Sequence, residues 1–172
     1  MPHYTRGMRI AVGSDHAGFD LKQAVARHLE EAGHVVVDLG TGSPDVSVDY
    51  PTFGLAVGRA VASGEVDRGV CVCGTGIGIG IAANKVEGVR AALVHDVTTA
   101  GLARRHNDAN VVCLGGRTTG PAVALDAVDT FFSTAYEGGR HQRRIDEISD
   151  YERSGPASPA GAGDHERQPA TP

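Results

Sequence analysis

Five short apolar runs recur along the chain, and segments with helical spacing lie between them. The runs are continuous rather than alternating, which is typical of parallel strands that are covered on both faces of a sheet. The intervening segments repeat apolar residues three or four positions apart, as amphipathic helices do. Strands are therefore predicted over residues 8–14, 34–40, 68–74, 89–95 and 110–116, and helices over residues 19–33, 53–64, 79–86, 98–106, 120–136 and 140–153.

Residues at the helix ends support this alternation. Gly33 closes the first helix, Pro51 is suited to open the second, and Thr98 and Thr99 are candidate caps of the fourth. Strands that alternate with helices predict one doubly wound α/β domain with a five-stranded parallel sheet and helices on both faces. No internal repeat is visible.

The two ends of the chain differ from the domain between them. The apolar pattern begins at Met8, so residues 1–7 are predicted to be an N-terminal extension and residues 8–152 the domain. Residues 153–172 are rich in Pro, Gly, Ala and Ser and have almost no large apolar side chains. Such a segment buries too little surface to offset its ordering entropy, so a disordered tail is expected.

Composition narrows the classes of partner. The formal charge is -5 at pH 7 over 172 residues, which argues against a nucleic acid or an anionic membrane as the partner of the whole surface. No apolar run reaches the ~18 residues of a membrane span. The N-terminus lacks the apolar segment of a signal peptide, and three cysteines suggest reduced thiols, so a cytoplasmic protein is expected.

Reactive residues gather where the predicted strands end. Ligands of open parallel sheets bind beyond the carboxyl ends of the strands. Cys73 ends the third strand and is followed by a glycine loop, where nearby backbone N–H groups would favour its thiolate. A buried, inert Cys73 is the alternative. Cys71 and Cys113 are expected to be packing residues, and no second Cys/His pair lies at a spacing that suits structural zinc.

The glycine loop after Cys73 has three possible meanings. Glycines allow a strand to turn sharply into a packed helix, and their N–H groups can also bind an anion. Gly78, Gly80 and Ala83, with Asp96 further on, also fit the G-x-G-x-x-A fingerprint of dinucleotide-binding folds. That match stands alone on the third strand, but it makes a nucleotide-binding module without catalysis the alternative to an enzyme.

Two further groups have both a structural and a functional interpretation. Arg140 and Arg144 lie four residues apart on a predicted helix, so they share a face that suits a phosphate, although solvated charged faces are common. His106 and Asn107 follow a predicted helix and either end it or serve as catalytic groups.

Six segments stand out by their order and spacing: SDHAGFDLK (14–22), DYP (49–51), CGTGIGIGIAANK (73–85), RHNDANV (105–111), LGGR (114–117) and YEGGRHQRRI (136–145). With these segments the chain resembles the type B ribose-5-phosphate isomerases over residues 8–152. The same superfamily includes galactose-6-phosphate and allose-6-phosphate isomerases. The combination of segments is specific, whereas no single segment is.

The resemblance implies a Rossmann-like fold and an aldose–ketose isomerase of the pentose phosphate pathway. It implies that Cys73 is the base that moves a proton between C1 and C2. A branch of the family instead uses a glutamate two positions along the loop, and that acid is absent here. Thr75 would assist proton movement between the two substrate oxygens. The anion hole for the enediolate would comprise Gly74, Thr75, Gly76, Ile77 and Gly78.

The resemblance also assigns the residues that hold the substrate. Asp15 and His16 would hold the sugar, and His106, with Asn107 beside it, would donate the proton that opens the furanose ring. The phosphate would be held by Arg117, Arg140 and Arg144.

The same resemblance implies how the enzyme is assembled. It implies a homodimer or a dimer of dimers whose sites are shared between subunits, with a sugar phosphate as ligand and no metal or organic cofactor. Ribose 5-phosphate and ribulose 5-phosphate are the expected substrates. Allose 6-phosphate, galactose 6-phosphate or a tetrose phosphate is the alternative, because all undergo the same chemistry and differ mainly in the pocket depth they need.

Overall fold

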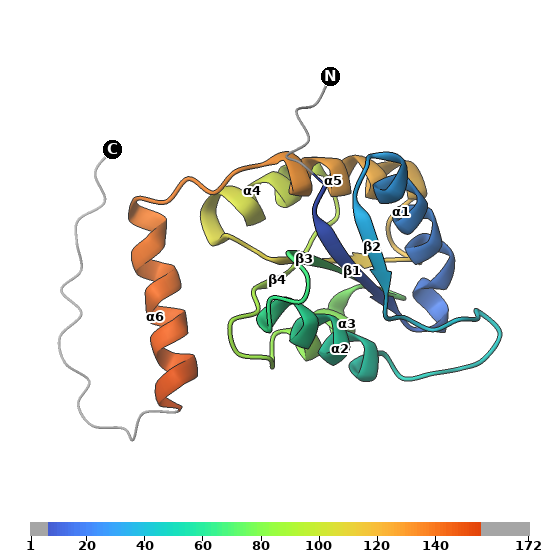
Figure 1. Cartoon of the computed structure of the whole chain (residues 1–172), viewed down its shortest axis with the longest axis horizontal. Coiled ribbons are helices and arrows are strands. Elements are labelled where there is room, and N and C mark those ends of the chain that lie inside the picture. The colour runs from blue at the N-terminus through green and yellow to red at the C-terminus, as the bar shows by residue number, and fades with distance from the viewer. Residues whose placement is uncertain (1–6, 156–172) are drawn as a thin grey trace.

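A computed structural model describes residues 7–155, and its centre is one five-stranded parallel sheet (Figure 1). The strand order is β2-β1-β3-β5-β4. The chain therefore adds β2 on one side of β1 and then crosses to add β3 on the other side, so the topological switch point lies between β1 and β3. This architecture confirms the predicted α/β fold with a parallel sheet. The strands are β1 (Arg9–Ser14), β2 (Val35–Asp38), β3 (Arg68–Cys73), β4 (Ala91–Leu93) and β5 (Val111–Gly115).

Helices cover both faces of the sheet (Figure 1). One face packs against α1 (Phe19–Glu31), α4 (Val97–Asn107) and α5 (Pro121–Ser133). The other face packs against α2 (Tyr50–Ala62) and α3 (Ile77–Ala83). A 3₁₀ turn, η1 (His16–Gly18), joins β1 to α1, and α6 (Arg140–Ser154) lies at one end of the molecule beside α4.

The two faces are packed with side chains of different size, because successive residues of a strand point to opposite sides. The face under α1, α4 and α5 carries Val, Ile and Leu together with Phe131 and Phe132. The face under α2 and α3 carries Cys71 opposite Cys113, and both are fully buried. These cysteines are packing residues, as predicted. The hydrogen bond to Cys113 raises the pKa of Cys71 well above its usual value, and burial raises it further.

Several element ends differ from the prediction. β4 has three residues instead of the seven of the predicted run 89–95, because the Arg90 amide donates to the Asn110 side chain (2.8 Å) rather than to a strand. The prediction that threonines cap α4 was wrong. Asp96 is the cap and accepts from the Thr99 amide (2.7 Å), while the Thr99 side chain accepts from the Asp96 amide, which completes a capping box.

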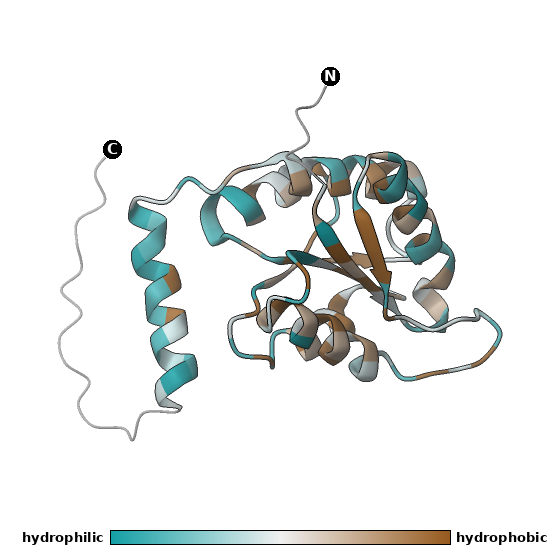
Figure 2. Ribbon diagram, in the orientation of Figure 1, coloured by the Kyte–Doolittle hydropathy of each residue, from teal (hydrophilic) through white to brown (hydrophobic). Residues whose placement is uncertain are grey.

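The C-terminal helix is set apart from the body of the fold. α6 continues to Ser154, and its mostly polar surface carries a few apolar positions (Figure 2). His141 and Ile145 are its buried residues, whereas Ile148 and Tyr151 are 51% and 61% exposed. The predicted extension and tail otherwise lie outside the described residues. Within residues 7–155, no helix is long and apolar enough to cross a membrane.

Candidate active site

A pocket of about 490 Å³ opens at the carboxyl ends of β1, β3 and β5, which we call the strand-end pocket. It lies where the strand order reverses, the place where open α/β sheets bind their ligands. Eight of the residues predicted for substrate or catalysis meet there, together with three further residues. The lining comprises Asp15, His16, Ala17, Tyr50, Cys73, Gly74, Thr75, Ile77, Gly78, Ile81 and Arg117.

Cys73 is the last residue of β3 and is almost buried, with 4% of its surface exposed. Its Sγ accepts a hydrogen bond from the backbone N–H of Gly76 at 3.2 Å. The contact directs a backbone N–H of the glycine loop at the sulfur atom, which is the candidate base or nucleophile of the pocket. The hydrogen bond comes from the glycine loop that the sequence singled out.

The glycines of this loop are required by close contacts. Gly76 has φ +78°, and a Cβ there would lie 2.6 Å from Leu93 Cδ1. A Cβ on Gly78 would lie 2.5 Å from Cζ of Tyr50, the residue whose ring closes that side of the pocket. The loop therefore turns sharply at Gly76 and brings main chain, rather than side chains, to the pocket wall.

Asp15 and His16 follow β1 and are positioned by local contacts. Asp15 is buried and caps η1, because its Oδ1 accepts from the Gly18 amide at 3.0 Å. His16 Nδ1 lies 3.2 Å from both the amide nitrogen and the carbonyl oxygen of Val48. This contact ties the loop between β2 and α2 to the pocket and leaves Nε2 as the nitrogen that can meet a ligand.

Arg117 is exposed and follows β5, where main-chain contacts join two strand ends. The Gly116 amide donates to the Cys73 carbonyl (2.8 Å), and the Arg117 amide donates to the Gly74 carbonyl (2.9 Å). The guanidinium lies over Gly74, where a Cβ would stand 3.4 Å from Nη1. These contacts fix the backbone from which the Arg117 side chain extends relative to Cys73.

Lys22 anchors a loop next to the pocket, a role that no pattern in the sequence indicated. Its side chain is fully buried in α1, and Nζ donates to Asp38 Oδ1 (2.7 Å) and to the Thr41 carbonyl (3.1 Å). A buried ammonium needs such partners. Because Asp38 ends β2, the contact anchors the start of the loop that reaches His16. A lysine on a predicted helix resembles any surface lysine, so its burial could be found only from the fold.

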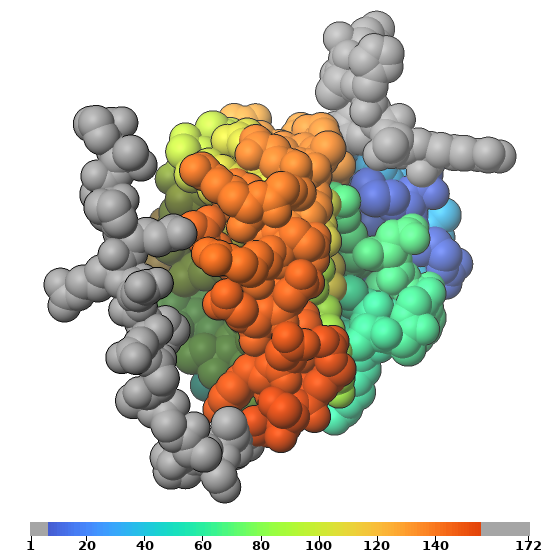
Figure 3. All heavy atoms as spheres, turned by 90° about the vertical axis from the view of Figure 1, so that its left-hand side faces the viewer, coloured from blue at the N-terminus to red at the C-terminus, as the bar shows by residue number. Residues whose placement is uncertain are grey.

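The remaining predicted residues lie elsewhere in the chain. A groove of about 380 Å³, which we call the α6 groove, lies between α6 and the region of β4. Asn107 lines it, and His106 lies beside it at the end of α4. Arg140 and Arg144 are exposed on α6. Figure 3 shows this helix as a ridge on its side of the molecule. The strand-end pocket and the α6 groove share no lining residue.

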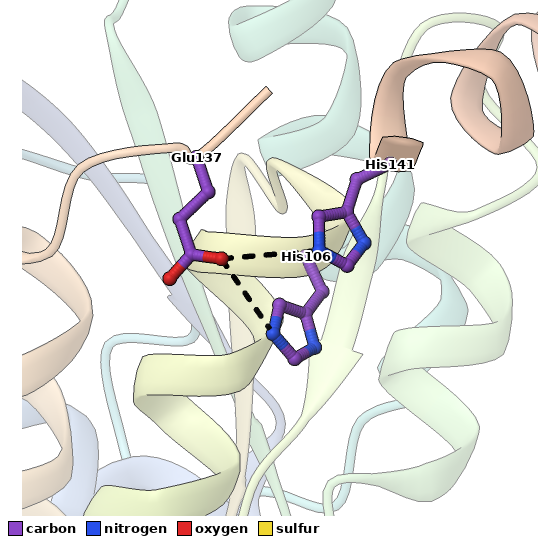
Figure 4. Close-up of side chains that lie close together, drawn as sticks. All are labelled: His106, Glu137 and His141. Carbon is purple, nitrogen blue, oxygen red and sulfur yellow. Dashed lines mark ion pairs between the residues drawn. The ribbon is translucent and has the colours of Figure 1, made fainter. Parts of the chain in front are cut away.

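His106 stacks on His141, and both face Glu137 (Figure 4). The ring centroids are 4.3 Å apart with planes 10° from parallel. Glu137 Oε2 lies 3.9 Å from His106 Nε2 and 3.8 Å from His141 Nε2. Desolvation lowers the pKa of His141, and its electrostatic interactions with His106, Arg140 and Arg144 lower that pKa further, against the opposing effect of Glu137.

The turn that precedes Asn110 fixes the end of α4. Asp108 adopts φ +44°, a left-handed conformation that is uncommon for residues other than glycine. Its carboxylate is held by Arg104 Nη1 (2.8 Å) and Arg90 Nη2 (3.1 Å), contacts that compensate for the backbone strain. His106 and Asn107 are therefore presented from a rigid helix end.

Two residues of the dinucleotide fingerprint, Asp96 and Gly80, have structural roles in the fold. Asp96 caps α4, and Gly80 packs so closely on β5 that a Cβ would lie 3.2 Å from Cys113 Sγ. These contacts explain the spacing without a nucleotide. The same region offers a sulfur, a cation and a main-chain loop, which suits a small anionic substrate that exchanges protons.

Comparisons with known proteins agree with this site. The profile of the family described as Ribose/Galactose Isomerase matches residues 10–148. Ribose-5-phosphate isomerase B of Escherichia coli is 47% identical over 145 residues, which are 84% of this chain and 97% of that protein. The solved structure of Clostridium thermocellum ribose-5-phosphate isomerase B superposes with a TM-score of 0.84 at 50% identity, and covers 86% of this chain and 99% of its own.

A third relative was solved with a ligand. Ribose-5-phosphate isomerase B from Mycoplasma genitalium, with bound ribulose-5-phosphate, has a TM-score of 0.82 at 45% identity and covers 87% of this chain and 99% of its own. These likenesses run through the whole sheet and both groups of predicted residues. The chain belongs to the ribose/galactose isomerase family.

Proposed function

We propose that this chain interconverts D-ribose 5-phosphate and D-ribulose 5-phosphate through an enediolate. The observation that carries the proposal is the meeting of Cys73, Asp15, His16 and Arg117 in one pocket, with the Cys73 sulfur hydrogen-bonded to the Gly76 amide. The relatives named above support the choice of substrate. Three free cysteines favour the cytoplasm as the place of action.

Cys73 is the base in this proposal. The open-chain aldose presents its C2–H to the thiolate, which takes the proton while the C1 carbonyl becomes an oxyanion. The same sulfur then returns the proton to C1, and a proton moves from O2 to O1, which Thr75 assists. Atoms and charge balance without an oxidant, because hydrogen moves only within the substrate. General-base catalysis of this kind contributes about 10²–10⁴-fold in rate.

The glycine loop stabilises the charge that develops on the substrate oxygens. Gly74, Thr75, Ile77 and Gly78 line the pocket, and Gly76 holds the turn between them. Main-chain donors that are already in place need no reorganisation in the transition state, and one such donor contributes ~3 kcal/mol. Asp15 and His16 hold the sugar hydroxyls next to this loop. Arg117 provides a cation at the same pocket.

The site is completed by a second copy of the chain. His106, Asn107, Arg140 and Arg144 lie outside the strand-end pocket of their own chain, yet ring opening and phosphate binding need a proton donor and cations. Apolar residues are exposed on both sides of such a contact: Ile77 (52%) and Ile81 (58%) by the pocket, and Ile148 (51%) on α6. A homodimer, alone or paired, would bring His106 of one subunit to Cys73 of the other.

Tyr50 bears on the choice between a pentose and a hexose phosphate. Its ring stands against Gly78 and lines the pocket. One methylene-sized difference in a substrate contributes only ~1–3 kcal/mol to discrimination, so allose 6-phosphate, galactose 6-phosphate and tetrose phosphates are the competitors to compare. The pentose is preferred in this proposal because the relatives are ribose-5-phosphate isomerases.

The test is a coupled assay of ribose 5-phosphate conversion in the presence of EDTA, followed by the same assay with allose 6-phosphate. We expect turnover that EDTA leaves unchanged and a higher kcat/KM for the pentose. A higher kcat/KM for the hexose would replace the substrate and keep the reaction. Absence of turnover on every sugar phosphate would overturn the proposal.

A further inference from the structure

We propose that His106, Glu137 and His141 form a binding site for a divalent transition-metal ion, of which Zn²⁺ is the best match. Within residues 7–155 these three side chains are the group whose potential ligand atoms converge, all within 4.8 Å of one another. They come from the end of α4, the segment before α6 and the first turn of α6 (Figure 4). None of the three residues lines the strand-end pocket of the same chain.

The distances suit an ion between the side chains better than direct contacts. Oε2 of Glu137 is 3.9 Å from one histidine Nε2 and 3.8 Å from the other, which is too long for hydrogen bonds. Ligands of a tetrahedral zinc ion stand about 3.4 Å apart, given Zn–N and Zn–O bonds of about 2.0–2.2 Å. The two separations from the Glu137 oxygen exceed this spacing by about half an ångström, and the two histidine nitrogens lie within 4.8 Å of each other. Binding therefore requires the two stacked rings to turn until both nitrogens point at one ion.

Contacts around Glu137 hold its carboxylate in the orientation that coordination needs. The Glu137 amide donates to the Arg105 carbonyl at 3.1 Å, directly before His106. Arg105 Nε lies 3.5 Å from Oε1, so the other oxygen, Oε2, is the one that faces the histidines. Gly138 and Gly139 have φ values of +64° and +59°, which bend the chain so that Glu137 and His141 meet. Outer contacts of this kind orient metal ligands.

The donor set indicates the ion and its affinity class. Two imidazoles and one carboxylate suit zinc, nickel or copper rather than magnesium or calcium. Three protein ligands leave one coordination position open, as in zinc sites that exchange water. Arg105, Arg140 and Arg144 stand nearby and oppose a second positive charge. We therefore expect reversible binding of one ion per chain rather than a permanent structural zinc.

Occupancy would have a consequence for catalysis, and this step rests on the proposed function. A histidine whose Nε2 is bound to a metal cannot donate a proton from that nitrogen. Zinc would therefore inhibit the isomerase by removing the ring-opening donor. The metal is an inhibitor in this scheme and takes no part in the reaction.

The experiment is a Co²⁺ titration of the full chain after treatment with EDTA, followed by visible absorption, with Zn²⁺ as competitor. We expect one ion per chain and a spectrum of nitrogen and oxygen ligands without thiolate charge transfer. Glu137→Gln and His141→Asn should each weaken binding by at least about tenfold. Because His141 is buried, Glu137→Gln, whose side chain is exposed, keeps the test valid if the other variant unfolds.

His28→Asn is the matched control. His28 pairs with Asp129 at 2.6 Å on another part of the molecule, so this variant also loses one imidazole next to a carboxylate. It should bind the metal as the wild type does. Lack of binding at submillimolar Co²⁺, or binding that Glu137→Gln leaves unchanged, would overturn the site. Binding that leaves isomerase turnover unchanged would keep the metal site and remove His106 from the reaction.

Discussion

The loops around the strand-end pocket are joined to one another by backbone hydrogen bonds, whereas one wall of the α6 groove is a single helix at the edge of the fold. Two backbone hydrogen bonds, from Gly116 to Cys73 and from Arg117 to Gly74, join the loops around the pocket. α6 packs on α4 and leaves Ile148 and Tyr151 exposed. The loops of the pocket are thus held within one chain, whereas α6, beside the groove, exposes apolar side chains that a second chain could cover.

This difference bears on how catalysis is divided between the two regions. Groups that must sit within tenths of an ångström of the reacting carbons belong on a rigid scaffold, and the strand ends provide one. Groups that grip a phosphate or protonate a ring oxygen can come from a partner's helix. The comparison predicts that damage to the pocket abolishes proton transfer between C1 and C2, whereas damage on the side of the groove impairs ring opening, phosphate binding and assembly.

The largest effect is expected from Cys73→Ser. A hydroxyl at this place is a much weaker base than a thiolate at neutral pH, so kcat should fall at least ~10²-fold. Cys71→Ala is the control, because Cys71 is fully buried on the same strand and has no place in the pocket. It should lower the melting temperature and keep turnover close to the wild type. Near wild-type kcat in Cys73→Ser would remove the cysteine from the mechanism.

A mixture of two inactive variants tests whether the two regions meet across subunits. Cys73→Ser and His106→Ala are co-expressed with different tags. If each site takes Cys73 from one chain and His106 from the other, half of randomly paired dimers carry one intact site, and activity returns to about a quarter of the wild type. Mixed dimers purified through both tags carry one intact site of two, so their turnover of ribose 5-phosphate should reach about half of the wild type. If each site used residues of one chain only, mixing would restore nothing.

The arrangement of the pocket could be predicted from the sequence, because the logic of parallel sheets is local. Apolar runs marked the strands, and residues just after them had to meet at one edge. Asp15, Cys73 and Arg117 do lie together there, although their roles remain predictions. The start of β4 could not be predicted, because the Arg90 amide donates a hydrogen bond to the side chain of Asn110 instead of to a neighbouring strand.

Contacts between segments that are distant in the sequence could not be predicted from it. Glu137 reads as an ordinary exposed acid until α4 and α6 bring His106 and His141 beside it. The pairing of Lys22 with Asp38 is similar, because neither periodicity nor composition shows that this lysine is buried. In both cases the signal lies in the packing of elements, which no local pattern of residues records.

A smaller effect is expected from Arg144→Ala on α6. If this residue grips the phosphate of a substrate in the partner's pocket, the loss of a charge-assisted hydrogen bond should raise KM about tenfold and change kcat less. Arg143→Ala is the matched control on the same helix, because its side chain is 75% exposed and its ion pair is with Glu147. Equal KM values for the two variants would show that Arg144 belongs to a solvated face.

The smallest effect on turnover is expected from Lys22→Met, which tests how much the pocket depends on the support behind it. Methionine keeps most of the buried stem but loses the hydrogen bonds to Asp38 and the Thr41 carbonyl, so the free energy of unfolding should fall by about 1–3 kcal/mol. Only the loop that reaches His16 is loosened, and kcat/KM should fall a few-fold through KM.

Asp38→Ala sharpens the same point from the other side of the pair. It leaves the Lys22 ammonium buried, with the Thr41 carbonyl as its remaining hydrogen-bond acceptor among the described residues, whereas Lys22→Met leaves a half-exposed carboxylate that water can solvate. The aspartate variant should therefore be the less stable of the two in chemical denaturation. The reverse order would mean that the ion pair does not anchor the loop, and that the strand-end pocket is held by its main-chain contacts alone.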